Sequence, residues 1–147
     1  MESLDEIFTL IPHRAPFLWV DTIISFEVDC IVTEKTIPTD LEIFNGHYPG
    51  NPIMPGVLLC EALFQSGALL IGKITQAQNS KMQALPVLTR ISNAKFKRTV
   101  SPGATIQMKV KLIETISSVS FFKGKMTVGG KTAVQVDFAC AMSASAI

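Results

Sequence analysis

The stretch "GHYPGNPIMPGVLLCEALFQSGALLIGKI", residues 46–74, decides how this chain folds. Its beginning, Gly46 to Gly56, holds three prolines and three glycines around one histidine, His47. Prolines fix φ and glycines permit close backbone approach, so a stiff and irregular turn is expected here. The rest, Val57 to Ile74, is an apolar helical run whose only acid is Glu61. A helix that is apolar on nearly every side must be surrounded by other elements.

Strand patterns on both sides of this run supply those elements. Six segments are rich in β-branched and aromatic residues or alternate between apolar and polar: 17–26, 30–37, 87–98, 105–112, 119–128 and 132–142. Gly129-Gly130 is a strong signal for a two-residue hairpin. Residues 2–10 read as a short amphipathic helix and residues 75–83 as a polar loop. We therefore expect an α+β fold in which a curved antiparallel β-sheet wraps around a long central α-helix, as one domain over residues 1–147.

Composition narrows the classes of protein. The 147 residues are 48% hydrophobic with a mean hydropathy of +0.36, which predicts that part of the apolar surface lies at a subunit interface. The net charge of +1 gives no argument for nucleic acid. Three scattered cysteines indicate reduced thiols and a cytoplasmic protein. The acidic N-terminus does not resemble a signal peptide. Glu61 and Gln65 near the middle of the apolar run favour a buried helix over a membrane span.

Charge is distributed unevenly along the chain. Residues 1–73 carry three Lys or Arg against ten Asp or Glu, whereas residues 74–147 carry ten against two. Such asymmetry can steer an acidic partner toward the basic half. A solvated basic face of the sheet is an equally good interpretation of the charge alone.

His47 is the first candidate for chemistry. A lone histidine is more often structural than catalytic, but the stiff turn around this one indicates a positioned imidazole. Because imidazole titrates near neutrality, it suits general-base work.

Glu61 is the second candidate, because its neighbours at helical spacing are apolar or small apart from the amide of Gln65. Burial should raise the pKa of such a carboxyl and suit it to proton donation. A surface carboxylate paired with a cation is the plainer interpretation. The helix N-terminus at Gly56 offers unpaired N–H groups, a weak signal when taken alone. Cys60 reads as a small packing residue, and the histidine spacing predicts no metal site.

At these residues the chain resembles a known family. The blocks "IPHRAPFLWVD" (11–21), "GHYPGNPIMPGVLLCEALFQ" (46–65) and "NAKFKRTVSPG" (93–103) are similar to those of the FabZ-type 3-hydroxyacyl-[acyl-carrier-protein] dehydratases of type II fatty-acid synthesis. The resemblance implies the hotdog fold, homodimers that commonly assemble as trimers of dimers, and a site without cofactor or metal. It also implies an acidic acyl carrier protein as partner, with its acyl chain on a phosphopantetheine arm.

The resemblance also assigns roles. His47 from one protomer and Glu61 from the other match the catalytic pair, and glutamate at this position favours the FabZ side over FabA-type isomerases. Gln65 matches the residue that orients the acid, and Gly56 the N–H that polarises the thioester carbonyl. The substrate tunnel and the carrier-docking surface are then expected at these positions: Phe64, Ile91 and Phe96 for the tunnel, and Lys95, Lys97 and Arg98 for docking.

Some positions depart from the family pattern, and they leave the substrate open. These are Thr22, Arg90, Ser92, Asn93, Thr99 and Ala104. A specialised dehydratase of a polyketide or aryl-polyene pathway would look similar. A hotdog acyl thioesterase is a second function to consider, although the Gly-His-Tyr-Pro-Gly block with Glu61 on the following helix favours dehydration, and a non-catalytic carrier-binding subunit is less favoured. Acyl chain length, saturation and the choice between dimer and hexamer do not follow from the sequence.

Overall fold

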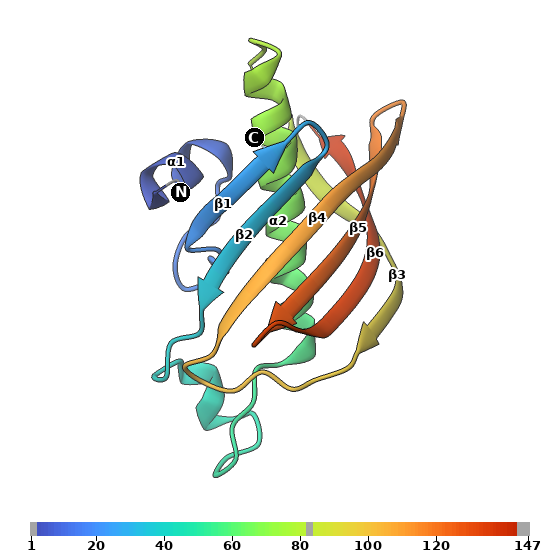
Figure 1. Ribbon diagram of the computed structural model, residues 1–147. Helices are drawn as coiled ribbons and strands as arrows, with labels where there is room; N and C mark the ends of the chain where they lie inside the picture. Colours follow the sequence, from blue (N-terminus) through green and yellow to red (C-terminus); the bar gives the residue numbers. More distant parts are fainter. Residues whose placement is uncertain (1–2, 82–83, 144–147) are drawn as a thin grey trace.

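The computed structural model describes residues 3–81 and 84–143 and contains a six-stranded antiparallel sheet around one long helix (Figure 1). The elements in chain order are α1 (Leu4–Leu10), β1 (Thr22–Glu27), β2 (Cys30–Thr36), the 3₁₀ turn η1 (Glu42–Asn45), α2 (Gly56–Ala77), β3 (Leu85–Phe96), β4 (Thr105–Ile116), β5 (Val119–Val128) and β6 (Lys131–Ser143). The strand order is β1-β2-β4-β5-β6-β3. This confirms the expected architecture of a curved sheet wrapped around a central helix.

The central helix α2 is held by contacts on nearly all sides. It begins directly after Pro55, whose φ of −57° and ψ of 131° make it the residue that caps the helix. A Cβ on Gly67 would lie 2.8 Å from the Phe138 ring, so glycine here allows β6 to pack closely. The most apolar window of α2 is long enough to cross a membrane, but 67% of it is buried inside the fold. The helix is therefore the core of this domain, as the sequence predicted.

The sheet follows the alternation read from the sequence. On β4 the side chains of Ile106, Met108 and Val110 are buried against the core, while Lys109 and Lys111 are exposed. The turn between β5 and β6 has positive φ at Gly129 and Gly130, 57° and 76°, as a two-residue hairpin of this type requires.

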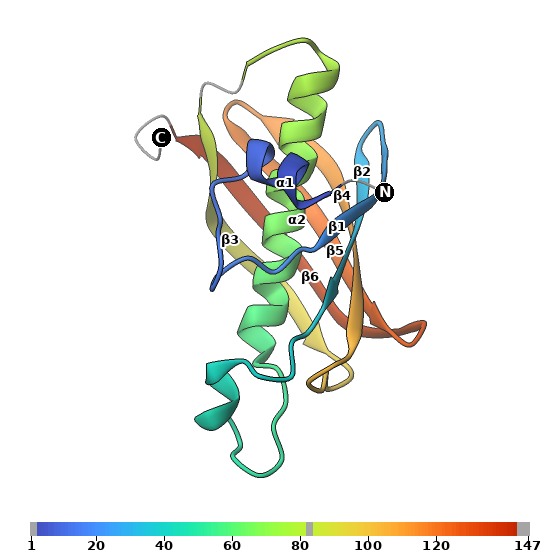
Figure 2. The ribbon, with the colours of Figure 1, turned by 90° about the vertical axis from the view of Figure 1, so that its left-hand side faces the viewer.

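The first strand is shorter than predicted. Residues 17–21 were expected to belong to a strand over 17–26, but β1 begins at Thr22. The preceding segment instead crosses α2 as an irregular chain, which Figure 2 shows from the open side of the sheet. Its backbone is bonded by the side chain of Gln65: Trp19 N–H donates to Oε1, and Nε2 donates to the Phe17 carbonyl, both at 2.8 Å. The Gln65 side chain on α2 thus makes backbone hydrogen bonds of the kind that a neighbouring strand would otherwise make.

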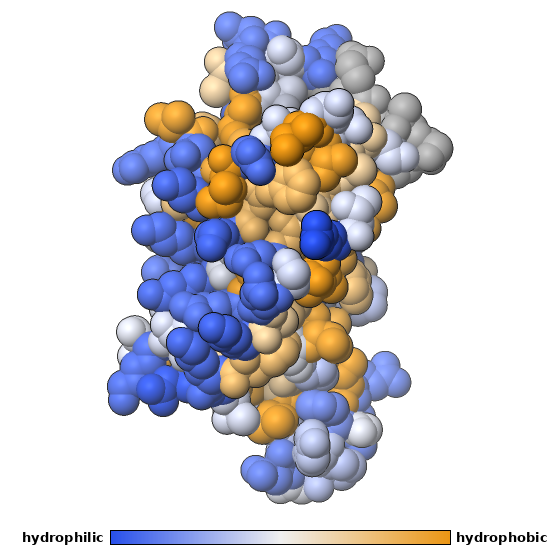
Figure 3. Space-filling model, turned by 90° about the vertical axis from the view of Figure 1, so that its right-hand side faces the viewer, coloured by the Kyte–Doolittle hydropathy of each residue, from blue (hydrophilic) through white to orange (hydrophobic). Residues whose placement is uncertain are grey.

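The edge strand β3 carries an apolar surface. Val87, Leu88, Ile91 and Phe96 are 41%, 37%, 51% and 54% exposed. Figure 3, which faces this edge, shows a long band of apolar side chains bordered by hydrophilic ones. Unpaired strand edges with apolar side chains are templates for pairing with another chain.

Candidate active site

The turn before α2 fixes the ring of His47. Its backbone N–H donates to the Ile43 carbonyl at 3.0 Å, and its Nδ1 lies 2.8 Å from the Ile53 carbonyl oxygen. A carbonyl can only accept, so Nδ1 carries the proton in this contact, and in the neutral ring Nε2 then keeps its lone pair. Tyr48 packs edge-on against the ring with 4.8 Å between centroids. The half-buried imidazole is thereby held in the tautomer that a general base at Nε2 needs.

Glu61 projects from the second turn of α2 into apolar surroundings. Its side chain is 21% exposed, and burial raises the pKa of the carboxyl, an effect that the hydrogen bond from Gln65 partly opposes. That bond runs from Gln65 Nε2 to Glu61 Oε1 at 3.2 Å. Since Gln65 is itself 1% exposed and bonded to the backbone of the 11–21 segment, it fixes the position of the carboxyl. The orienting contact predicted for Gln65 is present within one chain.

His13 lies beside Glu61, although the sequence predicted no role for it. Its Nε2 lies 3.8 Å from Glu61 Oε1, and its Nδ1 is buried without a hydrogen-bond partner among the described residues. Burial, and to a lesser degree the charge of Arg14, lower the pKa of His13, so the contact joins two polar groups and not two full charges at neutral pH. The signal that could have found it is its place in the block "IPHRAPFLWVD", which the first family motif covers.

A small cavity of about 70 Å³ adjoins Glu61. It is lined by side chains from α2, β3, β6 and the 11–21 segment: His13, Glu61, Phe64, Gln65, Ala68, Pro86, Leu88 and Cys140. Burial, with the Glu61 charge as a smaller cause, raises the pKa of the Cys140 thiol to about 12, so this thiol stays protonated. Burial also raises the pKa of Cys60. Neither thiol has the character of a nucleophile, in agreement with the sequence interpretation of Cys60.

His47 is not among the residues that line this cavity. It is held at the turn before α2, whereas Glu61 lies five residues beyond Gly56, about 7.5 Å along the helix axis. Within the described residues of one chain, no hydrogen bond joins the two side chains. One chain therefore holds the His47 imidazole at the turn before α2 and the Glu61 carboxyl on α2 itself, with no hydrogen bond between them among the described residues.

The other residues predicted for the site lie on α2 and β3, near either His47 or Glu61 or apart from both. Gly56, the candidate for the thioester carbonyl, opens α2, and a Cβ on it would lie 2.9 Å from the ring of Phe96, a tunnel candidate, so these two residues are neighbours. Phe64 is 8% exposed and packs edge-on against Phe138 with 4.9 Å between centroids. Ile91 faces solvent on β3. The structure thus brings Phe64 to Glu61 and Phe96 to Gly56, but leaves Ile91 outside the cavity of a single chain.

The three predicted docking cations lie at the end of β3. Lys95 is on the strand, while Lys97 and Arg98 follow it, and the backbone N–H groups of both donate to the Ala133 carbonyl. All three side chains are exposed. Among residues 3–81 and 84–143, no cluster of three His, Cys, Asp or Glu side chains could hold a metal ion.

The arrangement of helix and sheet defines a hotdog fold. The dehydratase heterocomplex ApeI:P from Xenorhabdus doucetiae has a similar structure, with a TM-score of 0.80 at 15% identity over 93% of this chain and 90% of that one. The E. coli PaaI protein superposes with a TM-score of 0.63 at 13% identity, covering 81% of this chain and 80% of that one. At these identities the likeness shows the fold alone.

Sequence relatives define the family more narrowly. Residues 11–137 match the model of the FabA-like domain. The chain is 40% identical to the 3-hydroxyacyl-[acyl-carrier-protein] dehydratase FabZ of Caulobacter vibrioides, covering 93% of this chain and 86% of the relative. It is 38% identical to the FabZ of Clostridium acetobutylicum, with coverage of 92% and 94%. The chain belongs to the FabA-like family, on its FabZ side.

Proposed function

We propose that this protein is a hydro-lyase that dehydrates 3-hydroxyacyl chains bound to acyl carrier protein, giving trans-2-enoyl chains for fatty-acid biosynthesis. One observation carries the proposal: α2 is preceded by a histidine whose Nδ1 is held against a backbone carbonyl, and it bears a half-buried carboxyl of raised pKa. Dehydration needs one group to remove a proton and another to supply one to a leaving hydroxyl. The FabZ relatives, named for this reaction, support the same assignment.

The proposed reaction uses the two groups on neighbouring carbons. His47 Nε2 takes the proton from C2, and the N–H of Gly56 at the helix N-terminus stabilises the charge that develops on the thioester oxygen. The Glu61 carboxyl donates its proton to the hydroxyl on C3. The C3–O bond then breaks, water leaves, and the electron pair from the C2–H bond forms the double bond. Gln65 keeps the carboxyl in place, and Phe64, Ile91 and Phe96 line the acyl tunnel.

The complete site is proposed to form between two protomers. His47 does not line the Glu61 cavity of its own chain, which supports a site in which a partner brings its histidine to that cavity. The apolar edge of β3 supplies a surface for this partner, because pairing two such strands would extend the sheet and cover Ile91 and Phe96. A homodimer, assembled further as a trimer of dimers, is the proposed form.

The carrier protein is proposed to dock in the cytoplasm on Lys95, Lys97 and Arg98. These cations are exposed at the end of β3, and two of them flank Phe96, which lies beside Gly56; this supports the placement. Their charge would attract an acidic carrier and raise its rate of association.

The test is incubation of the purified protein with a crotonyl thioester, followed by chromatography of the products. Hydration to the 3-hydroxy species without release of free thiol is expected. Release of free thiol without hydration would replace the proposal with a thioesterase, a class that shares this fold. His47→Ala and Glu61→Gln should each abolish hydration while light scattering shows an unchanged assembly. Full activity in both variants would remove the assigned pair.

A further inference from the structure

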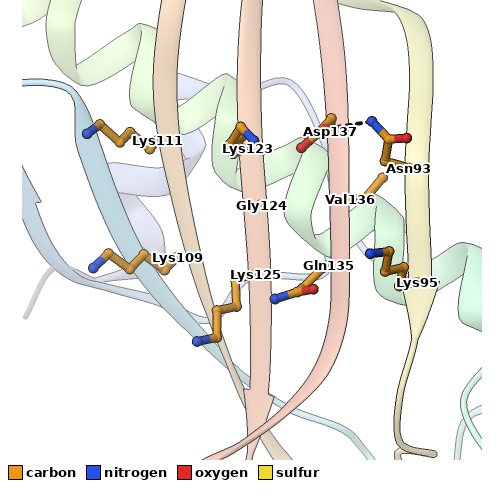
Figure 4. Close-up of a pocket in the computed structure, with 10 residues that line it drawn as sticks. All are labelled: Asn93, Lys95, Lys109, Lys111, Lys123, Gly124, Lys125, Gln135, Val136 and Asp137. Atoms are coloured by element: carbon orange, nitrogen blue, oxygen red, sulfur yellow. Dashed lines mark hydrogen bonds between the residues drawn. The ribbon is translucent and has the colours of Figure 1, made fainter.

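The outer face of the sheet, opposite α2, holds a hollow that the proposed reaction does not use. We call it the lysine groove, and its volume is about 560 Å³ (Figure 4). It is lined by residues of β3, β4, β5 and β6: Asn93, Lys95, Lys109, Lys111, Lys123, Gly124, Lys125, Gln135, Val136 and Asp137. Five lysines face one aspartate, which gives the lining a net charge of +4 by formal count.

Strand register places these lysines directly opposite one another. Lys109 pairs with Lys125 across β4 and β5, and Lys111 pairs with Lys123. On the next strand Lys125 is opposite Gln135, which in turn is opposite Lys95. One row across four strands therefore carries three lysines and an amide but no acid.

Such rows reduce the stability of a sheet, because like charges directly opposite each other repel. Asp137 is the one carboxylate of the groove, and it accepts a hydrogen bond from Asn93 Nδ2 at 2.9 Å. It lies in the second row, beside Lys123, so the row of Lys109 and Lys125 keeps its repulsion. A bound polyanion would relieve that repulsion.

The residues that line the groove indicate which kind of polyanion it would bind. Pockets for small organic ligands are mostly apolar, whereas the only apolar residues here are Gly124 and Val136. Single-stranded nucleic acid binds on aromatic platforms, and no aromatic side chain lines the groove. Neighbouring strands lie about 4.8 Å apart and alternate residues about 6.8 Å apart. This grid suits carboxylates spaced three or four residues apart on a helix, whose Cβ atoms are about 5–6 Å apart.

We propose that the lysine groove docks an acidic segment of a partner protein. The groove shares Lys95 with the proposed carrier-docking cations, but its other four lysines have no part in the proposed reaction, and Glu61 projects from α2 on the other side of the sheet. Charge complementarity supplies the attraction, and it would weaken steeply with salt.

The experiment uses the full-length protein and a fluorescent poly-L-glutamate, with binding followed by anisotropy at low and physiological ionic strength. We expect salt-dependent binding that is about tenfold weaker in the double variant Lys109→Gln/Lys125→Gln. Lys131→Gln, which removes an exposed lysine of β6 outside the groove, is the matched control and should bind as the parent does. The double variant should also melt at a higher temperature, because the cross-strand repulsion is gone, and should hydrate a crotonyl thioester at the parent rate.

Equal binding by parent and double variant would overturn the proposal. So would tighter binding of a single-stranded oligonucleotide than of poly-L-glutamate at equal charge concentration. A smaller assembly for the double variant in light scattering would assign the groove to a second copy of this chain instead. The hydration assay reports on the proposed function separately, so a failure of one is distinguishable from a failure of the other.

Discussion

Gln65 donates a hydrogen bond to Glu61 at 3.2 Å while the same side chain bonds the backbone on both sides of Leu18. One amide therefore couples the carboxyl of the central helix to the irregular segment that crosses it. Because Gln65 is almost wholly buried, none of these bonds can be replaced by bulk water. The position of the acid depends on the fold of residues 11–21.

We predict that Gln65→Leu weakens both stability and catalysis. The Trp19 N–H and the Phe17 carbonyl would lose their partner, at a cost of about 1–3 kcal/mol for each buried group left unpaired. Urea denaturation measures the loss in the free energy of unfolding, and kcat for hydration should fall with it. Gln76→Leu, an exposed position on the same helix, is the control. A Gln65→Leu protein as stable as this control would contradict the bridging role.

Glu61 should make the protein less stable as pH rises. Burial raises the pKa of this carboxyl in the folded state above its unfolded value, so the folded protein binds the proton more tightly. Stability is then greatest below the unfolded pKa, about 4.3, and is lost as pH rises through the folded pKa. Removal of the charge in Glu61→Gln should flatten this fall in melting temperature.

The rate of dehydration should also depend on whether the Glu61 carboxyl is protonated. If the carboxyl donates the proton, kcat for dehydration falls as pH rises past its pKa; Glu61→Gln then loses about 10²–10⁴-fold below that pKa and less above it, where the parent also lacks the proton. Thermal melting and initial rates on one pH series measure both effects. A Glu61→Gln protein with the parent's slope in melting temperature would show that this carboxyl titrates normally.

His13 should make the protein less stable as pH falls, the reverse of the effect of Glu61. Burial and Arg14 lower the pKa of His13 in the folded state, so its stabilising effect is present above the unfolded pKa, about 6.5, and is lost as pH falls through the folded value. His13→Gln removes this titration and should reduce the acid-side loss of melting temperature. His47→Gln provides the comparison with the chain's other histidine. An unchanged acid-side slope in His13→Gln would mean that the ring is hydrated and titrates freely.

The parts of the fold that the sequence predicted are those with local patterns. The alternation around Lys109 and the glycine pair at 129–130 each specify a strand or turn within a few residues. Residues 17–21 were predicted as strand and are not, because their backbone hydrogen bonds are made by Gln65, more than forty residues away in sequence. His13 escaped notice as a neighbour of Glu61 for the same reason. The candidates His47 and Glu61 were found because their own local surroundings, a stiff turn and an apolar helix, are unusual.

Two glycines on α2 should respond differently to alanine. At Gly67 the new Cβ would meet the buried Phe138 ring at 2.8 Å, and because that ring also stacks on Phe122 it cannot move away. Gly67→Ala should cost about 1–3 kcal/mol in the free energy of unfolding. At Gly56 the Cβ would meet Phe96, which is 54% exposed in a single chain and is therefore less confined than Phe138. Gly56→Ala should therefore change the KM for acyl thioesters with little loss of stability. A severe loss of stability in Gly56→Ala would show that Phe96 is held rigidly.

Mixed assemblies test where the catalytic pair forms. If His47 of one protomer serves Glu61 of its partner, a dimer of one His47→Ala chain and one Glu61→Gln chain keeps one intact site, while each variant alone has none. Random exchange of equal amounts should place half of the dimers in this mixed form and restore about a quarter of the parent's activity, since each mixed dimer has one of two sites. Differently tagged chains allow exchange to be verified before the hydration rate is measured. Verified exchange without recovery would place both groups of the working site in a single chain, and the histidine would then have to reach the Glu61 cavity by a rearrangement of the turn that precedes α2.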